Sequence, residues 1–134
     1  MKIRKSALMV EQVSIILSTN NKLKYKYPGC PTISCIIRDH KMEHVLLDLG
    51  ASVNLLPYSV YLQLNLGELK STLTTLLLAD KSVKVPKGIV EDVLVQVDKF
   101  IYTVDFIILE TKHVNNYKLI PVILGRPFLA TANA

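Results

Sequence analysis

VLLDLGASVNLLP, residues 45–57, places a single carboxylate, Asp48, between two apolar runs. The apolar residues before Asp48 predict a buried strand. Gly50 permits backbone angles that other residues avoid, so the chain can turn sharply just past Asp48. We therefore expect the carboxylate at the end of a strand, in a tight loop. A charge placed there is costly unless it is hydrogen-bonded, and the nearest donors are the N–H groups of Gly50 and Ala51 and the hydroxyl of Ser52.

An isolated Asp-x-Gly most often forms an ordinary β-turn, because both residues favour turns. The flanking sequence argues against a solvent-facing turn here. Val45-Leu46-Leu47 precedes Asp48, and Val53, Leu55 and Leu56 follow it closely. The apolar flanks indicate a loop that is held against a core on both sides.

The segment Leu47–Ser52 resembles the active-site loop of retroviral-type aspartic proteases, the retropepsins, and above all the protease segments of Gypsy-type retrotransposon polyproteins of plants. A second motif, Val122-Ile123-Leu124-Gly125-Arg126, resembles the retropepsin segment that passes behind this loop and leads into a short helix. Segments 78–82 and 88–93 are also similar to the plant group, and the resemblance runs from Leu23 to the end of the chain. It implies an aspartic endopeptidase that processes a retroelement polyprotein. Asp48 would be the catalytic residue, and its active-site loop would consist of Leu49, Gly50, Ala51 and Ser52. The motif that supports this loop would consist of Ile123, Leu124, Gly125 and Arg126.

Peptide hydrolysis of this type needs two carboxylates that share one proton, because two like charges about 3 Å apart cannot both ionise. The ionised carboxylate takes a proton from water, and the protonated one polarises the scissile carbonyl. Only Asp48 has both the glycine and the apolar flanks; Asp39, Asp80, Asp92, Asp98 and Asp105 do not. The site therefore requires a homodimer in which each subunit supplies one Asp48. Its partner is a polypeptide substrate, and no cofactor is expected.

The chain departs from the retropepsin pattern in two places. The family usually has Thr or Ser after the aspartate, with a hydroxyl that hydrogen-bonds across the dimer, whereas this chain has Leu49. We expect Leu49→Thr to restore that bond and strengthen the dimer by roughly 1 kcal/mol on each side. The chain also ends at Ala134, before the terminal strand of the family, so we expect a truncated domain. The alternative is a catalytically inactive protease-like domain that binds a peptide or dimerises.

The resemblance also implies a flap, a β-hairpin that closes over the substrate. Its counterpart is the turn formed by Ala79, Asp80, Lys81 and Ser82. An ordinary surface turn explains the same residues.

The pattern of apolar and charged residues along the rest of the chain predicts two regions. These are a basic leader over residues 1–29 and a protease-like domain over residues 30–134. The leader holds a short amphipathic helix, Leu8–Leu17, followed by a linker. The domain is predicted as a small closed all-β barrel with one or two short helices, and Asn54 is a possible helix cap. Its expected strands are Thr32–Arg38, Met42–Leu47, Leu73–Ala79, Val83–Val85, Ile89–Val97, Phe100–Leu109 and Val122–Leu124; its expected helices are Tyr58–Leu64 and Arg126–Ala132.

Composition excludes several classes of protein. The chain has 134 residues, which is the length of one domain, and a net charge of +5 from 16 Lys and Arg against 11 Asp and Glu. Much of the excess lies in the leader, and we interpret it as a solvated basic segment rather than a nucleic-acid interface. No apolar run approaches the roughly 20 residues of a membrane span. Two cysteines make no disulfide framework, so we expect an intracellular, cytoplasmic protein without a membrane partner.

Cys30, Cys35, His40 and His44 raise the alternative of a zinc site. Their spacing is poor, because zinc fingers have a tighter cysteine pair and a longer span before the histidines. We therefore expect no metal, and we predict that Cys35 is a core residue.

Overall fold

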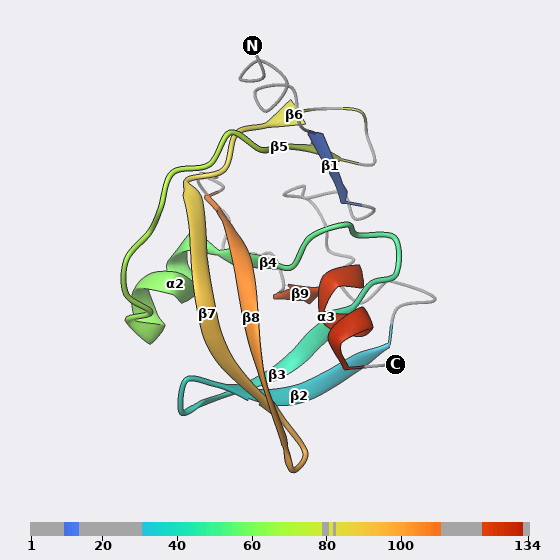
Figure 1. Ribbon diagram of the computed structural model, residues 1–134, viewed down its shortest axis with the longest axis vertical. Helices are drawn as coiled ribbons and strands as arrows, with labels where there is room; N and C mark the ends of the chain where they lie inside the picture. Colours follow the sequence, from blue (N-terminus) through green and yellow to red (C-terminus); the bar gives the residue numbers. More distant parts are fainter. Residues whose placement is uncertain (1–9, 14–30, 79–80, 82, 111–121, 133–134) are drawn as a thin grey trace.

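The computed structural model describes residues 10–13, 31–78, 81, 83–110 and 122–132 (Figure 1). Over these residues the chain is built mainly from strands, with two short helices. In chain order the elements are β1 (Val10–Val13), β2 (Thr32–Ile37), β3 (His40–Leu47), β4 (Leu55–Pro57), α2 (Tyr58–Leu64), β5 (Thr75–Leu78), β6 (Val83–Lys84), β7 (Gly88–Val97), β8 (Phe100–Leu109), β9 (Ile123–Leu124) and α3 (Arg126–Thr131).

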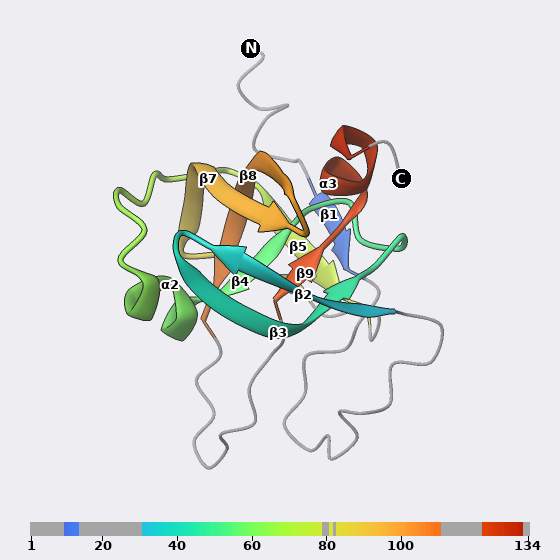
Figure 2. The same ribbon diagram turned by 90° about the horizontal axis from the view of Figure 1, so that it is seen from below.

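Six strands close into a barrel in the order β2-β3-β9-β4-β8-β7, and β7 pairs with β2 to complete the ring. Two antiparallel hairpins, β2–β3 and β7–β8, supply four of these strands. The short strands β4 and β9 join them, because β9 pairs in parallel with β3 and β4 pairs in parallel with β8 (Figure 2). The predicted all-β closed barrel with short helices is confirmed.

The turn residues of the two hairpins explain where each hairpin reverses direction. The β2–β3 turn consists of Arg38 and Asp39, whose φ angles are 48° and 70°. Positive φ at both central residues is the geometry of a type I′ turn, which matches the twist of the strands. The turn therefore begins one residue earlier than the predicted Asp39–Lys41 turn. The β7–β8 turn lies at Asp98 and Lys99, as predicted, with Val97 paired to Phe100.

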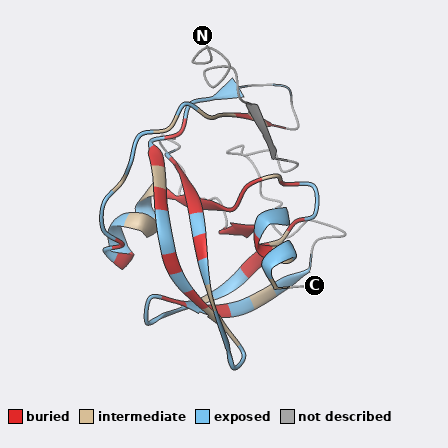
Figure 3. Cartoon of the chain, viewed as in Figure 1, coloured by how far each residue is buried: buried red, intermediate tan, exposed pale blue. Residues whose placement is uncertain are grey.

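Apolar side chains form two clusters. Figure 3 shows in red which positions along the strands are buried. The first fills the barrel and contains Cys35, Val95 and Phe106 among others. The second combines barrel residues with the two inward leucines of β5; its buried members are Leu46, Ala51, Val53, Leu55, Leu76, Leu78, Ile107, Leu109 and Ile123. The loop after Asp48 therefore contributes to the cluster that attaches β5 to the barrel.

The two predicted domain helices are confirmed. Helix α2 follows Pro57, and Asn65 ends it in the left-handed conformation, with a φ of 53°. Helix α3 carries Pro127 in its first turn. An N–H at that position has no acceptor within the helix, so the missing N–H of proline costs no hydrogen bond. Neither helix of the described residues is long and apolar enough to cross a membrane.

The predicted helix Leu8–Leu17 is wrong over its described part, because Val10–Val13 is strand β1. It pairs in parallel with β5, from Val10 opposite Thr75 to Val13 opposite Leu78. A helix of about ten residues is marginal in water, whereas this pairing satisfies the backbone groups, and β-branched valines favour strands. The predicted linker lies outside the described residues.

Candidate functional site

Asp48 directly follows β3 and is 3% exposed. Its position is set by the parallel pairing of β3 with β9, in which Leu46 lies opposite Ile123 and Leu47 opposite Leu124. The Asp48 N–H continues this ladder and donates to the Leu124 carbonyl at 3.0 Å. The predicted placement of Asp48 at the end of a strand, against the Ile123-Leu124-Gly125 segment, is confirmed.

The loop itself supplies a donor to the carboxylate. The Gly50 N–H donates to Asp48 Oδ1 at 2.9 Å, as predicted. The Ala51 N–H donates to the main-chain carbonyl of Asp48 at 3.1 Å and closes a tight turn. Among the described glycines, positive φ occurs at Gly67 and Gly88 and not at Gly50. The turn therefore forms without the left-handed geometry that Gly50 was expected to supply.

Gly125 and Arg126 hold the loop from behind. A Cβ on Gly125 would lie 2.3 Å from the Val53 carbonyl oxygen and 2.7 Å from that of Ala51, so only glycine allows this approach. The Arg126 N–H donates to the Ala51 carbonyl at 2.9 Å. Its guanidinium Nη1 donates to the Leu49 carbonyl at 3.2 Å. The second sequence motif thus contacts the first through its backbone and through one side chain.

Asn54 is a part of this site that the sequence reasoning did not identify. It is 4% exposed, and its Oδ1 accepts a hydrogen bond from the Gly125 N–H at 2.8 Å. Its Nδ2 donates to the Asp105 carbonyl on β8 at 3.2 Å. The interpretation of Asn54 as a helix cap is therefore wrong, because helix α2 has Pro57 at its N-cap. The available signal was an amide between apolar residues, which must find buried partners.

Leu49 differs sharply from its neighbour, because it is 72% exposed. Its carbonyl is held by Arg126, and Gly50 beside it is also exposed. The surface next to the buried carboxylate is therefore apolar and open to solvent in the single chain.

The predicted flap corresponds to the hairpin between β5 and β6, in which Leu77 lies opposite Val83. Of its turn residues, Lys81 is described: it has a φ of 76°, and its N–H donates to the Leu78 carbonyl at 2.9 Å. Ala79, Asp80 and Ser82 lie outside the described residues. Leu76 and Leu78 share the second apolar cluster with Ala51 and Val53, so the base of the hairpin is attached to the Asp48 loop.

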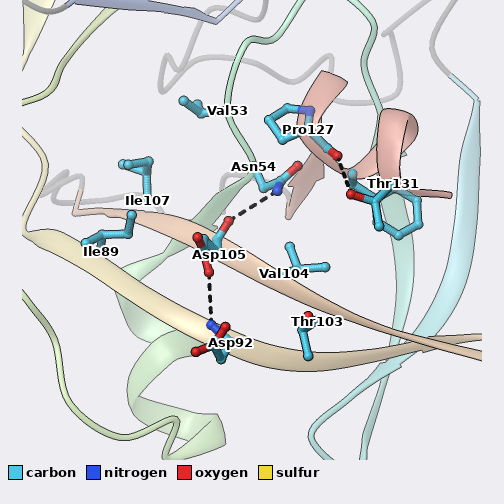
Figure 4. Close-up of a pocket in the computed structure, with 11 residues that line it drawn as sticks. Val53, Asn54, Ile89, Asp92, Thr103, Val104, Asp105, Ile107, Pro127 and Thr131 are labelled. Carbon is cyan, nitrogen blue, oxygen red and sulfur yellow. Dashed lines mark hydrogen bonds between the residues drawn. The ribbon is translucent and has the colours of Figure 1, made fainter. Parts of the chain in front are cut away.

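A pocket of about 360 Å³ lies between α3, the β7–β8 hairpin and the Val53-Asn54 end of the Asp48 loop (Figure 4). The Asp105 carboxylate lies at this pocket and accepts a hydrogen bond from the Asp92 N–H at 2.9 Å. Asp48 is not among its lining residues, which are Val53, Asn54, Ile89, Asp92, Thr103, Val104, Asp105, Ile107, Pro127, Phe128 and Thr131. The pocket therefore borders the C-terminal end of the Asp48 loop at Val53 and Asn54, and Asp48 itself does not line it.

The residues of the zinc alternative are dispersed where they are described. Cys35 is a buried core residue, as predicted, and burial raises the pKa of its thiol to about 11. His40 Nδ1 lies 3.0 Å from the Arg38 carbonyl in the exposed turn. Among the described residues, no group of three or more His, Cys, Asp or Glu is placed to hold a metal. Cys30 lies outside the described residues.

No family model and no curated protein matches the chain. Among solved structures, the chain is similar to EIAV protease in complex with the inhibitor HBY-793, at 19% sequence identity and a TM-score of 0.49. The match covers 82% of this chain and 94% of that one.

Proposed function

We propose that the chain is one half of an aspartic endopeptidase, in which two copies each contribute Asp48 to a shared active site. The observation that carries this proposal is a buried carboxylate at the end of a barrel strand, 3% exposed and bonded by the Gly50 N–H at 2.9 Å. Burying a carboxylate is costly, so a position that keeps one enclosed in a rigid loop is typical of a functional site.

The need for a second copy follows from the count of suitable carboxylates. Asp48 is the one buried acidic residue among the described residues; Asp39, Asp92, Asp98 and Asp105 are exposed. A second carboxylate of the same kind therefore has to come from another chain. A two-fold axis brings identical residues together, so a symmetric dimer with Asp48 at the axis supplies the pair.

In such a pair one carboxylate is ionised and the other keeps the shared proton. The ionised Asp48 takes a proton from a water molecule, and the water oxygen attacks the scissile carbonyl. The protonated Asp48 donates to the carbonyl oxygen as the tetrahedral intermediate forms. The Gly50 N–H stabilises the ionised carboxylate, and the two contacts from Arg126 keep the loop in place.

The substrate class that we propose is an extended polypeptide, covered by the β5–β6 hairpin as a flap. Support comes from the second apolar cluster, which joins Leu76 and Leu78 of β5 to Ala51 and Val53 of the loop. From the resemblance of the loop to Gypsy-type retrotransposon proteases of plants, we infer that the natural substrate is a retroelement polyprotein, cleaved in the cytoplasm.

The test is cleavage of a denatured protein or a peptide library from about pH 4 to 7, with and without pepstatin. A coupled pair of carboxylates gives a bell-shaped rate profile on the acidic side of neutral. We expect Asp48→Asn to abolish cleavage while the fold and the dimer persist, because the change removes the base and the shared proton together. The matched control is Asp98→Asn, which changes an exposed aspartate in the β7–β8 turn and should cleave like the wild type.

Two outcomes contradict the proposal. Equal cleavage by the wild type and Asp48→Asn places the activity in another site or in a contaminant. No cleavage by a wild type that is folded and dimeric favours the alternative, an inactive domain that binds a peptide or dimerises; the open apolar surface at Leu49 is the observation on its side.

A further inference from the structure

Two adjacent residues of the loop have opposite environments. Asp48 is 3% exposed, whereas Leu49 is 72% exposed. Removing a leucine side chain from water lowers the free energy. The exposure of Leu49 is therefore unfavourable in the single chain and would be relieved by burial. A lone exposed leucine is common on protein surfaces and needs no explanation by itself. The position of Leu49, directly beside the carboxylate, is what gives its exposure a consequence.

That consequence follows from covalent geometry and rests on the proposed function. If two copies of Asp48 share a proton, their carboxylates lie about 3 Å apart. Consecutive Cα atoms are about 3.8 Å apart, so each Leu49 must then lie close to the same two-fold axis. At a two-fold axis a residue can contact its own copy.

Contacts within the chain hold the Leu49 backbone in this position. Arg126 Nη1 donates to the Leu49 carbonyl at 3.2 Å, and the Arg126 N–H donates to the Ala51 carbonyl at 2.9 Å. Behind the loop, Gly125 packs so closely that a Cβ on it would lie 2.3 Å from the Val53 carbonyl oxygen. Leu49 is therefore presented at the surface by a loop that is fixed on both sides.

We propose that Leu49 is the apolar dimer contact of the active site, and that Leu49 of one copy packs against Leu49 of the other beside the two carboxylates. This contact removes two exposed side chains from water. It also covers one side of the carboxylate pair with hydrocarbon, which strengthens the electrostatic coupling between the two groups. The hydroxyl bond expected from the family pattern is replaced by burial. The expectation that Leu49→Thr strengthens the dimer is thereby reversed.

The first experiment measures dimer dissociation by sedimentation equilibrium. We expect Leu49→Ala to raise the dissociation constant about 100-fold, because each dimer loses the burial of two leucine side chains. Leu49→Thr should also weaken the dimer, since the lost burial exceeds what two hydroxyl bonds return. The matched control is Leu62→Ala on helix α2, where the leucine is 58% exposed; its dimer should dissociate like the wild type.

A second experiment tests the geometry directly. A disulfide forms only when the two Cα atoms lie about 4.4–6.8 Å apart. In a Cys30→Ser background, mild oxidation of Leu49→Cys should give a covalent dimer, and Leu62→Cys should not. Circular dichroism of each variant establishes that it is folded.

The outcomes separate this inference from the proposed function. A dimer that forms as tightly with Leu49→Ala as with the wild type, or that tightens with Leu49→Thr, overturns the contact and leaves the shared Asp48 site standing. A dimer in which Leu49→Cys does not cross-link overturns it as well. A wild type that stays monomeric at all concentrations overturns the proposed function, and the contact falls with it.

Discussion

At the scale of single residues, the most testable feature is the thiol of Cys35. It is 3% exposed in the barrel core, and burial raises its pKa from the ordinary value of 9.0 to about 11. The folded chain therefore keeps this thiol neutral at a pH where the unfolded chain ionises it. The stabilisation is complete below about pH 9 and is lost as the pH rises to about 11.

We predict that the free energy of unfolding falls across this range, by on the order of 2 kcal/mol from Cys35 alone. Urea unfolding from pH 8 to 11 measures it, and Cys35→Ala is the control, since lysines and tyrosines titrate in both proteins. The two proteins should converge in stability as the pH rises. If the unfolding free energies of the two proteins instead change in parallel with pH, the thiol ionises as readily in the folded chain as in the unfolded chain.

Other single residues show how far sequence reasoning reaches. Asp48 and Cys35 were placed correctly from local information, because apolar residues flank Asp48 and free cysteine is among the most buried residue types. The contacts of Asn54 were missed, because its partner Gly125 is 71 residues away in the chain. Only the register of β9 against β3 and β4 brings these two residues together.

At the scale of elements, the register of β7 against β8 shifts between Val90 and Val93. Asp92 lies in this bulge with a φ of 55°, and its N–H donates to Asp105 Oδ1 rather than to a neighbouring strand carbonyl. A bulge leaves one residue out of the ladder, so its N–H needs another acceptor. The Asp105 carboxylate provides it.

We predict that Asp105→Ala destabilises the fold by about 1 kcal/mol, because it removes this acceptor. Asp105→Asn keeps an acceptor oxygen and should cost less. Thermal or urea unfolding measures both, and Glu43→Ala serves as the control, since Glu43 is an exposed acid whose ion pair with Lys41 is long, at 3.9 Å. If Asp105→Ala and Glu43→Ala unfold alike, the bulge does not depend on the carboxylate.

The strands also show where the pattern of apolar residues was insufficient to predict the secondary structure. The β7–β8 hairpin was predicted with its turn in place, because alternating valines and the Asp98-Lys99 turn are both local signals. The strand Val10–Val13 was taken for a helix, because its spacing of apolar residues fits both. Its partner β5 lies far away in the chain, and this non-local pairing decides in favour of the strand.

At the scale of the whole molecule, the barrel is closed within one chain but the proposed active site is half of a pair. We predict that Asp48→Asn inhibits the wild type when the two are mixed. If all chains are dimeric and exchange freely, an equal amount of Asp48→Asn leaves about half of the wild-type chains paired with each other. Cleavage per wild-type chain should fall to about half.

Asp98→Asn is the control in this mixing experiment. Because it should cleave like the wild type, an equal amount of it should double the rate per wild-type chain and leave the rate per total chain unchanged. Sedimentation of labelled chains establishes that subunits exchange before the assay. An unchanged rate with Asp48→Asn, in a mixture shown to exchange, would mean that one chain contains a complete site.

The barrel order β2-β3-β9-β4-β8-β7 has a consequence for the time at which the proposed activity can begin. The ribosome makes Asp48 early, but its hydrogen-bond partner Leu124 emerges only after both long hairpins. Strand β9 must then enter between β3 and β4, a non-local step of the kind that slows folding. A nascent chain that ends before residue 124 has the carboxylate and lacks the support behind its loop. The proposed activity therefore begins only after the C-terminal segment has been synthesised and β9 has entered the barrel.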